Sequence, residues 1–468
     1  MSGHTPLEAP LEGPLEAPLE ARQAVERALE QVQRAGADQA DALLLEGDSV
    51  EVRVRNGEID VVSQARERVL GIRALVGSSE GFRSAVSSTS DLSPSAVERM
   101  AEETAALARA TAPDPAAGLP DAGFTEDLPD LGIRDASDAG PTLEARIDVA
   151  RRAEDAARGV DPRIANFEGT DVNSDTTRRV YGNSQGFLAE YESTSHGISC
   201  MPIAQENGSM QMSWWSSVTR RWCDLDDPTH VGRVAAERAL SRLGARRVPT
   251  CEVPIVFEPA TARSLLGHLV ACVSGSSVYR GTSFLAGRLG EAVASERVSV
   301  VDDGRRIGGL GSRPFDGEGL PTRRTPVIEN GRLASYLLDT YSARKLGMAS
   351  TGNASRGAGS APGAGPTNLW LEPGEGDLDA IIADTERGFL VTWLFGHGFN
   401  PVSGDFSRGA AGHWIEGGRL SHPVEEVTIA GNLLDMLRNV DAVGDDLLWQ
   451  GSVASPSVRI SSMTVAGE

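Results

Sequence analysis

The sequence has few of the residues from which disulfide frameworks, metal sites and membrane spans are built. Its 468 residues include only 4 cysteines and 7 histidines. The cysteines lie far apart and never at C-x-x-C spacing, so free and mostly buried thiols are a better interpretation than a zinc or redox site. No apolar run approaches the length of about 18 residues that a membrane-spanning helix requires. The four cysteines are Cys200, Cys223, Cys251 and Cys272.

Lysine occurs only once, as Lys345, and Leu346 follows it. A P-loop requires a lysine that is followed by serine or threonine, so this class of phosphate site is excluded. The formal net charge of −22 argues against direct binding of nucleic acid. The first residues contain neither the basic nor the apolar segment of a secretory signal, so the sequence predicts a cytoplasmic protein without a membrane anchor.

Composition and local patterning divide the chain into five parts. Residues 1–21 repeat Pro-Leu-Glu and predict a disordered tail, because a proline at every fourth position removes helical hydrogen bonds. Residues 22–110 predict an N-terminal α+β region. Residues 111–141, rich in Pro, Asp and Gly, predict a linker or an exposed connection, and residues 142–245 predict a second α+β region packed with the first. Residues 248–468 predict a mostly β domain.

Helix and hairpin signals support an α+β fold with an antiparallel sheet and helices in two layers. Asn56-Gly57, between two alternating runs, predicts a tight hairpin turn. Four helices are expected, and short strands are expected between them. The helices are expected from about 22 to 36, 93 to 110, 143 to 158 and 228 to 244, and the strands over 42–46, 50–55, 59–63, 68–76 and 82–87 and between 178 and 221.

The C-terminal region predicts short strands joined by glycine-rich connections, and whether they close into a barrel stays open. Glu329-Asn-Gly331 and Glu416-Gly-Gly418 predict hairpins. Two helices are expected, over 260–273 and 431–439. The strands are expected over 252–257, 298–301, 332–337, 389–395, 424–429 and 457–465.

No histidine pair has the spacing of a metallopeptidase helix, because no two of the seven histidines lie within five residues of each other. His397, His413 and His422 occur in one region beside several glutamates and could meet in the fold, or they could be ordinary turn and edge residues. His268, on a predicted helix, is better interpreted as a hydrogen-bonded or packed histidine. A G-x-S-x-G nucleophile motif is also absent, and the glycine-flanked Ser276 and Ser407 are interpreted as turn residues.

Charged and hydroxyl groups are dense in three glycine-lined segments, which surround Asp339 to Gly347, Ser407 to Gly409 and Glu425-Glu426. Such groups could contact an extended peptide or a partner subunit, and backbone exposed by glycine could pair with another strand. A surface of satisfied salt bridges is the alternative. The candidate contact residues are Asp339, Tyr341, Arg344, Asn353, Arg408, Glu425 and Glu426.

Several long segments, which occur in the same order as in the TldD/PmbA family, resemble that family and within it the PmbA (TldE) branch. They include Tyr336–Met348, Ser350–Asn353, Gly398–Ala410, Pro423–Leu433 and Pro456–Ile460. Together they span most of the last 220 residues, whereas the earlier half agrees mainly in layout.

The resemblance implies a cytoplasmic heterodimer with zinc-dependent peptidase activity toward small modified peptides and unfolded antitoxins. It implies that a TldD-like partner carries the zinc, through an H-E-x-x-x-H helix and a cysteine near its C-terminus. The corresponding positions here hold Leu266, Gly267 and Ala271, His268 is out of register, and no cysteine follows Cys272. We therefore expect a non-catalytic subunit that binds no cofactor itself, contacts an extended peptide, and binds no nucleic acid or membrane.

Other interpretations remain open at this point. The chain could be a metallopeptidase by itself, through an unrecognised site such as the group of His397, His413 and His422. It could instead be an interaction protein, as the family's older label of DNA gyrase modulator implies, that acts on a gyrase inhibitor. A homodimer in the absence of the partner also stays open.

Overall fold

The computed structural model describes residues 17–121, 123–124, 128–137 and 140–467. Most of the predicted tail, residues 1–16, lies outside the described residues. Residues 17–20 have no regular structure, and the first helix already begins at Ala21.

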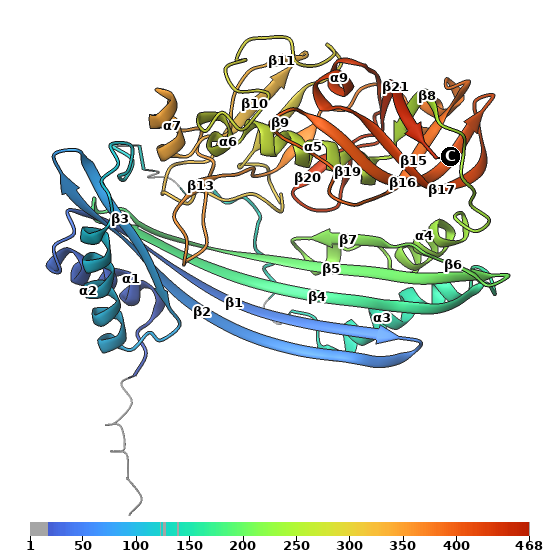
Figure 1. Ribbon diagram of the computed structural model, residues 1–468. Coiled ribbons are helices and arrows are strands. Elements are labelled where there is room, and N and C mark those ends of the chain that lie inside the picture. The colour runs from blue at the N-terminus through green and yellow to red at the C-terminus, as the bar shows by residue number, and fades with distance from the viewer. Residues whose placement is uncertain (1–16, 122, 125–127, 138–139, 468) are drawn as a thin grey trace, which may run out of the picture.

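The N-terminal half forms one curled antiparallel sheet of seven strands (Figure 1). Strand β1 pairs with both β2 and β4, so the two α+β regions expected from the sequence share this sheet. The turn between β1 and β2 is the predicted Asn56-Gly57 hairpin, in which both residues have positive φ angles. The strands are β1 (Gln39–Arg55), β2 (Glu58–Ser78), β3 (Gly81–Thr89), β4 (Ile164–Asn183), β5 (Leu188–Glu206), β6 (Ser209–Met212) and β7 (Trp215–Thr219).

The strands of this sheet are much longer than predicted. β1 joins the two strands that were expected over 42–46 and 50–55, and β2 joins those expected over 59–63 and 68–76. Strand β4 begins at Ile164, whereas the sequence predicted a start near 178. The alternation of apolar and polar residues breaks in the polar middle of β1, and for this reason the sequence predicted two strands there. Pairing with two neighbours carries the backbone through that point, and Glu46 forms ion pairs with Arg68 of β2 and Arg178 of β4.

Four helices cover one face of the sheet, as the apolar spacing predicted. Leu44 and Ile72 pack in a core cluster with the first two helices, and Val172 and Ile198 in a cluster with the next two. Leu43, next to Leu44, points to the opposite face, where it is buried with Phe315 of the C-terminal region. The helices are α1 (Ala21–Arg34), α2 (Pro94–Ala110), α3 (Leu143–Arg158) and α4 (Pro228–Leu240).

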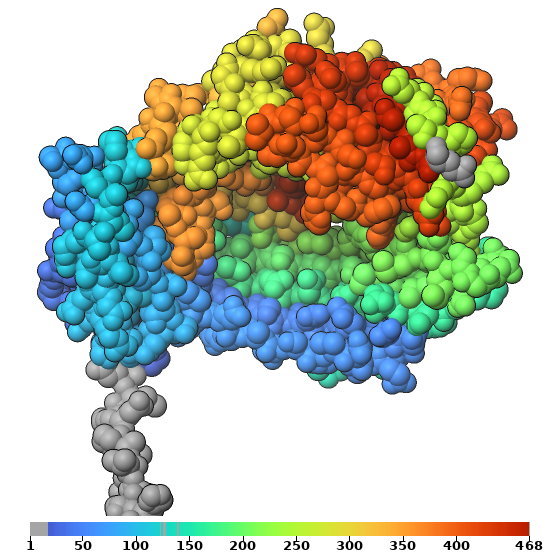
Figure 2. All heavy atoms as spheres, viewed as in Figure 1, coloured from blue at the N-terminus to red at the C-terminus, as the bar shows by residue number. Residues whose placement is uncertain are grey.

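The C-terminal region lies over the free, concave face of this sheet, and Figure 2 shows a hollow between the two. Its centre is a closed barrel of five strands, because β17, at one end of the path β17-β16-β15-β8-β21, also pairs with β21. The structure thus closes the barrel that the sequence left open. The strands are β8 (Cys251–Phe257), β15 (Arg387–Phe395), β16 (Asp405–Glu416), β17 (Arg419–Asn432) and β21 (Val458–Ala466), and β18 (Val440–Val443) pairs with β21.

Helix α5 (Pro259–Val273) contributes a row of leucines to the largest core cluster, which it shares with the barrel. A second sheet, in the order β11-β10-β9-β14-β20-β19, lies beside it. The strand predicted over 332–337 is only two residues long, because the chain turns there toward α7. The remaining elements are η1 (Trp222–Asp224), α6 (Gly275–Tyr279), β9 (Val300–Asp303), β10 (Arg324–Glu329), β11 (Arg332–Leu333), α7 (Thr340–Leu346), β12 (Ala354–Ser355), β13 (Gly363–Ala364), β14 (Leu369–Leu371), α8 (Leu378–Ala383), α9 (Leu433–Arg438), β19 (Leu448–Trp449) and β20 (Val453–Ser455).

None of the helices in the described parts of the chain is both long enough and apolar enough to span a membrane.

Candidate functional site

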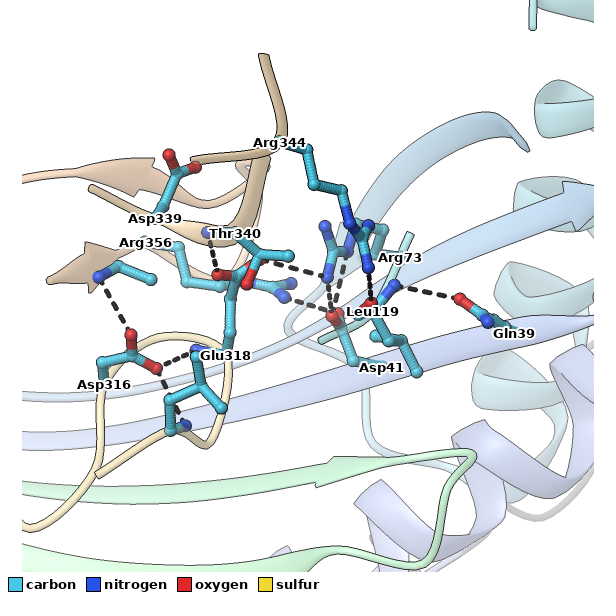
Figure 3. Close-up of polar contacts among 12 residues, drawn as sticks. Gln39, Asp41, Arg73, Leu119, Asp316, Glu318, Asp339, Thr340, Arg344 and Arg356 are labelled. Carbon is cyan, nitrogen blue, oxygen red and sulfur yellow. Dashed lines mark hydrogen bonds and ion pairs between the residues drawn. The ribbon is translucent and has the colours of Figure 1, made fainter. Parts of the chain in front are cut away.

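A buried ionic network joins the N-terminal sheet to the C-terminal region (Figure 3). Asp41 of β1 lies between Ala40 and Ala42, which face the helices, so its carboxylate faces the C-terminal region. Arg73, opposite Asp41 on β2, donates from Nε to Asp41 Oδ2 at 2.9 Å. Arg356, directly after β12, donates to the other carboxylate oxygen. The network therefore ties three distant segments together.

The two arginines keep Asp41 ionised in spite of its burial. Burial alone would raise the pKa of Asp41, but Arg356 and Arg73 outweigh it and hold the pKa below its usual value. The Nε and Nη2 atoms of Arg356 are buried and have no hydrogen-bond partner among the described residues. Removal of Asp41 would thus leave the Arg356 guanidinium group uncompensated in a low-dielectric environment.

Two further carboxylates extend this network. Glu318 lies 4.0 Å from Arg73 and accepts a hydrogen bond from the Thr340 backbone N–H at 2.8 Å. Asp316 accepts hydrogen bonds from three backbone N–H groups, those of Glu318, Leu320 and Ala354. Burial raises the pKa of Asp316 and of Glu318, and their mutual repulsion adds to the shift of Glu318. Proton-binding groups of this kind are common in functional sites and also occur in structural ion networks.

A polar cavity of about 420 Å³ opens beside the network. Its walls come from the sheet, from the connection after α2, from α6 and α7, and from the loop before β13. Arginine, carboxylate and hydroxyl groups all reach it, so it can bind a polar chain segment. The polar lining residues are Arg73, Ser84, Asp114, Ser276, Tyr279, Arg280, Glu318, Asp339, Tyr341 and Ser342.

Three of the predicted contact residues lie on or next to α7. Asp339 caps the helix, with its carboxylate accepting the Ser342 N–H at 3.0 Å. Tyr341 donates to Asp114 at 2.7 Å, and Arg344 donates to the Leu119 carbonyl at 2.6 Å. These hydrogen bonds fasten the connection after α2 to the C-terminal region.

Asn353 lies in the same part of the molecule but is buried. Its side-chain amide donates to Asp302 Oδ2 at 2.7 Å, and Thr367 also donates to that carboxylate, from its N–H at 2.6 Å and its hydroxyl at 2.8 Å. Burial outweighs these hydrogen bonds and raises the pKa of Asp302 to about 6. The Asn353 amide is therefore used inside the fold.

The other three predicted residues lie on the barrel, apart from the α7 group. Glu425 accepts from Gln211 of β6 at 2.7 Å, and Glu426 from Arg247 at 2.8 Å. Arg408 of β16 is half-buried, and its Nε has no partner among the described residues. The structure thus does not gather the seven residues into one site.

Helix α5 lies where the family resemblance implies the zinc-binding helix of a TldD-like chain. Here its His268 is surrounded by two aromatic rings and an arginine. The His268 ring packs on Phe399 with ring centroids 4.4 Å apart and meets Phe406 edge-on at 5.8 Å. Burial, together with nearby Arg408, lowers the pKa of His268 to about 4. Leu266, two residues before His268 on α5, is buried in the core. These residues do not fit a zinc ion, which requires converging imidazole, carboxylate or thiolate donors.

The other possible donors are engaged elsewhere. His413 Nε2 contacts the Ser241 carbonyl at 3.0 Å, and His422 contacts the Ser421 hydroxyl at 3.2 Å. Burial raises the pKa of the Cys272 thiol to about 12. Within the described ranges, no three His, Cys, Asp or Glu side chains lie close enough together to hold a metal ion, so the group of three C-terminal histidines does not form there.

The network around Asp41 was missed in the sequence, although one signal for it was present. Asp41 and Arg73 each interrupt an apolar run, in Ala40–Leu45 and Gly71–Val76. A charge inside an apolar strand is rarely buried unless it is paired, so the two positions indicated a buried ion pair. Glu318 and Arg356 lie in glycine-rich loops and carried no such signal.

Comparison with protein-family models matches three consecutive parts of the chain. Residues 40–108 match PmbA/TldA metallopeptidase domain 1, residues 137–243 the central domain, and residues 250–467 the C-terminal domain.

Individual relatives agree with these matches. The chain is 38% identical to metalloprotease PmbA of Escherichia coli O157:H7 over 92% of its own length and 93% of that protein. The crystal structure of a candidate modulator of DNA gyrase from Bacteroides thetaiotaomicron superposes with a TM-score of 0.87 at 28% identity, covering 95% of this chain and 98% of that one. TldE from Thermococcus kodakarensis has the same fold, with a TM-score of 0.85 at 23% identity over 95% of this chain and 100% of that one.

Proposed function

Because the chain is a PmbA-type member of the PmbA/TldD metallopeptidase family, we propose that it is the non-catalytic subunit of a heterodimeric peptidase whose zinc is held by a TldD-like partner. The complex would act on small or unfolded peptides in the cytoplasm. This chain would supply architecture and peptide contacts, and the partner would supply the metal.

The environment of His268 is the observation that carries this proposal. A zinc-binding histidine must approach the ion as a neutral donor with other ligands converging on it. The His268 ring packs against Phe399, and burial together with nearby Arg408 lowers its pKa, so the ring is neutral but has a cation rather than further ligands beside it. A divalent cation would be repelled by Arg408. The other possible donor on α5, the Cys272 thiol, is buried and has its pKa raised to about 12, and Leu266 and Leu269 are buried in the core.

The concave face of the N-terminal sheet supports the part of the proposal that concerns the peptide. Val172 and Ile198 pack toward α3 and α4, so their neighbours Asp171, Asn173 and Ser199 point the other way, toward the hollow (Figure 2). These three residues line a groove of about 470 Å³ that crosses β1, β4 and β5. A groove of polar side chains suits the backbone of an extended peptide better than it suits a folded domain.

The division of labour leaves hydrolysis to the partner. A zinc ion bound there would polarise the scissile carbonyl and activate a water molecule. The residues of this chain would bind the peptide, limit access to chains that are flexible enough to enter, and exclude bulk water.

Co-expression with a TldD-like chain tests the proposal. The subunits are separated after purification, and the zinc in each is measured by mass spectrometry together with the activity of the complex toward an unfolded peptide. We expect zinc only in the partner and full activity only in the complex. The variant His268→Phe should assemble and cleave as the unmodified chain does, whereas replacement of the glutamate in the partner's H-E-x-x-x-H motif should abolish cleavage.

A peptidase that acts alone is the second candidate, because the similar Escherichia coli protein carries the name metalloprotease. The lone chain decides between the two candidates: about one zinc per chain together with peptide cleavage would support the second and exclude the first. The name of the Bacteroides relative also suggests an interaction with gyrase or its inhibitors. Stable capture of such a protein by the lone chain, with no complex formed with a TldD-like chain, would favour that role.

A further inference from the structure

An arginine-lined cleft lies next to α7, apart from the polar cavity described above. Its volume is about 660 Å³, and it is open to solvent. Among the described residues, four guanidinium groups line it and one carboxylate, that of Asp121, does so. This excess of positive charge contrasts with the formal charge of −22 for the whole chain. The four arginines are Arg305, Arg323, Arg324 and Arg344.

Two of these arginines carry charge that no described carboxylate neutralises. Arg305 donates from Nε to the Thr322 carbonyl at 2.7 Å. Arg323 donates to the carbonyls of Thr351 at 3.0 Å and Ser350 at 2.5 Å. Backbone carbonyls orient a guanidinium group but leave its net charge in place, so both groups stay available to attract an anion.

The other two arginines form ion pairs that are too weak to prevent the binding of an anion. Arg324 pairs with Glu372 at 2.7 Å, with both side chains about half exposed. Arg344 pairs with Asp121 at 3.0 Å, and the Asp121 side chain is 93% exposed. Solvent-exposed pairs of this kind contribute roughly 0–1 kcal/mol, so an incoming anion could displace them.

A buried hydroxyl without a partner adds a second, independent sign of a ligand. Thr340, the first residue of α7, lines the same cleft and is only 7% exposed. Its backbone N–H is used by Glu318, but its Oγ1 has no hydrogen-bond partner among the described residues. Thr340 and Arg344, both drawn in Figure 3, belong to α7, so one helix contributes a neutral donor and a cationic donor.

We propose that this cleft binds an anionic group, a carboxylate or a phosphate. Guanidinium groups match the planar or tetrahedral oxygens of these anions and can donate two parallel hydrogen bonds. Leu320 and Met348 also line the cleft and provide apolar surface for the organic part of such a ligand. The site does not depend on a TldD-like partner, and so it goes beyond the function proposed above.

Isothermal titration calorimetry of the full-length chain tests the site, with inorganic phosphate and with triglutamate as separate probes at a fixed ionic strength set with sodium chloride. The double variant Arg305→Gln/Arg323→Gln should weaken binding at least tenfold. The control Arg151→Gln/Arg297→Gln removes the same charge from exposed positions outside the cleft and should change the Kd less than twofold.

The proposal is supported if either probe binds the unmodified chain and binds the cleft variant at least tenfold more weakly. The probe that binds more tightly shows whether phosphate or carboxylate is the preferred anion. If neither probe binds, or if the cleft and control variants weaken binding equally, the proposal is wrong. Should circular dichroism show that the double variant is unfolded, Arg324→Gln takes its place. Its partner Glu372 is on the surface, and it should weaken binding at least threefold; an unchanged Kd would overturn the proposal.

Discussion

Asp41 and Arg356 form a fully buried ion pair although they lie 315 positions apart in the sequence. Asp41 belongs to the N-terminal sheet and Arg356 to a loop of the C-terminal region, and Arg73 completes the group. The pair therefore fixes how the C-terminal region lies over the concave face of the sheet (Figure 3).

Asp41→Asn should destabilise the protein by about 3–5 kcal/mol, because it leaves the buried Arg356 guanidinium group without a counter-charge and leaves Arg73 with only Glu318, 4.0 Å away. Chemical denaturation followed by fluorescence measures the change. Asp48→Asn is the control, since Asp48 pairs with Arg66 at 3.5 Å in an exposed position and should contribute less than about 1 kcal/mol. Equal effects of the two substitutions would contradict the role given to the buried network.

Asp302 should make the protein less stable as the pH rises from about 4 to 6. Burial raises its pKa from 3.8 to about 6, so the folded state binds the proton more tightly than the unfolded state. Above pH 6 the stabilisation that the proton gives is lost, roughly 2–3 kcal/mol. Asp302→Asn should flatten this part of the curve of unfolding free energy against pH, whatever its effect on overall stability. Asp316 and Glu318, whose pKa values burial also raises, should leave part of the slope in the variant, so a slope that is not reduced at all would contradict the role given to Asp302.

His268 should change the dependence of stability on pH in the opposite direction to Asp302. Its pKa is lowered from 6.5 to about 4, so the unfolded state binds the proton more tightly and stability is lost as the pH falls through this window. His268→Phe should remove the part of that loss that His268 causes and keep the packing on Phe399, while His196, His413 and His422, whose pKa values burial also lowers, keep their own parts. The same titration with His230→Phe, at an exposed position on α4, serves as the control and should keep the acid loss. An acid loss that is unchanged in His268→Phe would mean that the folded state does not lower the pKa of His268.

Tyr341→Phe should loosen the connection after α2 and lower the free energy of unfolding by roughly 1 kcal/mol, because it removes the hydrogen bond to Asp114. Limited proteolysis measures the effect, with faster cleavage expected between residues 111 and 121. Tyr279→Phe, which removes only a contact with the neighbouring Arg280, should leave the cleavage rate unchanged. An identical rate in all three proteins would show that Tyr341 does not hold this segment.

The sequence predicted most of the helices because their signals are local. Ser93-Pro94 and Asp227-Pro228 begin α2 and α4 at the residues expected, and Asn56-Gly57 forms the expected hairpin. The barrel could not be derived from periodicity, because it depends on pairing between β17 and β21, which no local pattern encodes. The length of β1 was missed for a related reason, since its two neighbours hold its polar centre extended.

The sequence placed α7 in a region dense in polar groups, and the structure shows what those groups contact. Asp339, Tyr341 and Arg344 lie together, but each already has partners within the chain. Their role toward a peptide or a partner subunit stays a prediction. Of the four cleft arginines, only Arg344 was among the predicted contact residues. Arg305, Arg323 and Arg324 were not predicted, because they lie on segments that only the fold brings next to α7.

The zinc content and peptidase activity of the lone, purified chain, compared with those of its complex with a TldD-like protein, test the central claim most directly. The account predicts less than about 0.1 zinc per lone chain and no cleavage of an unfolded peptide, with activity appearing when the partner is added. One tightly bound zinc and cleavage of the peptide by the lone chain would contradict it.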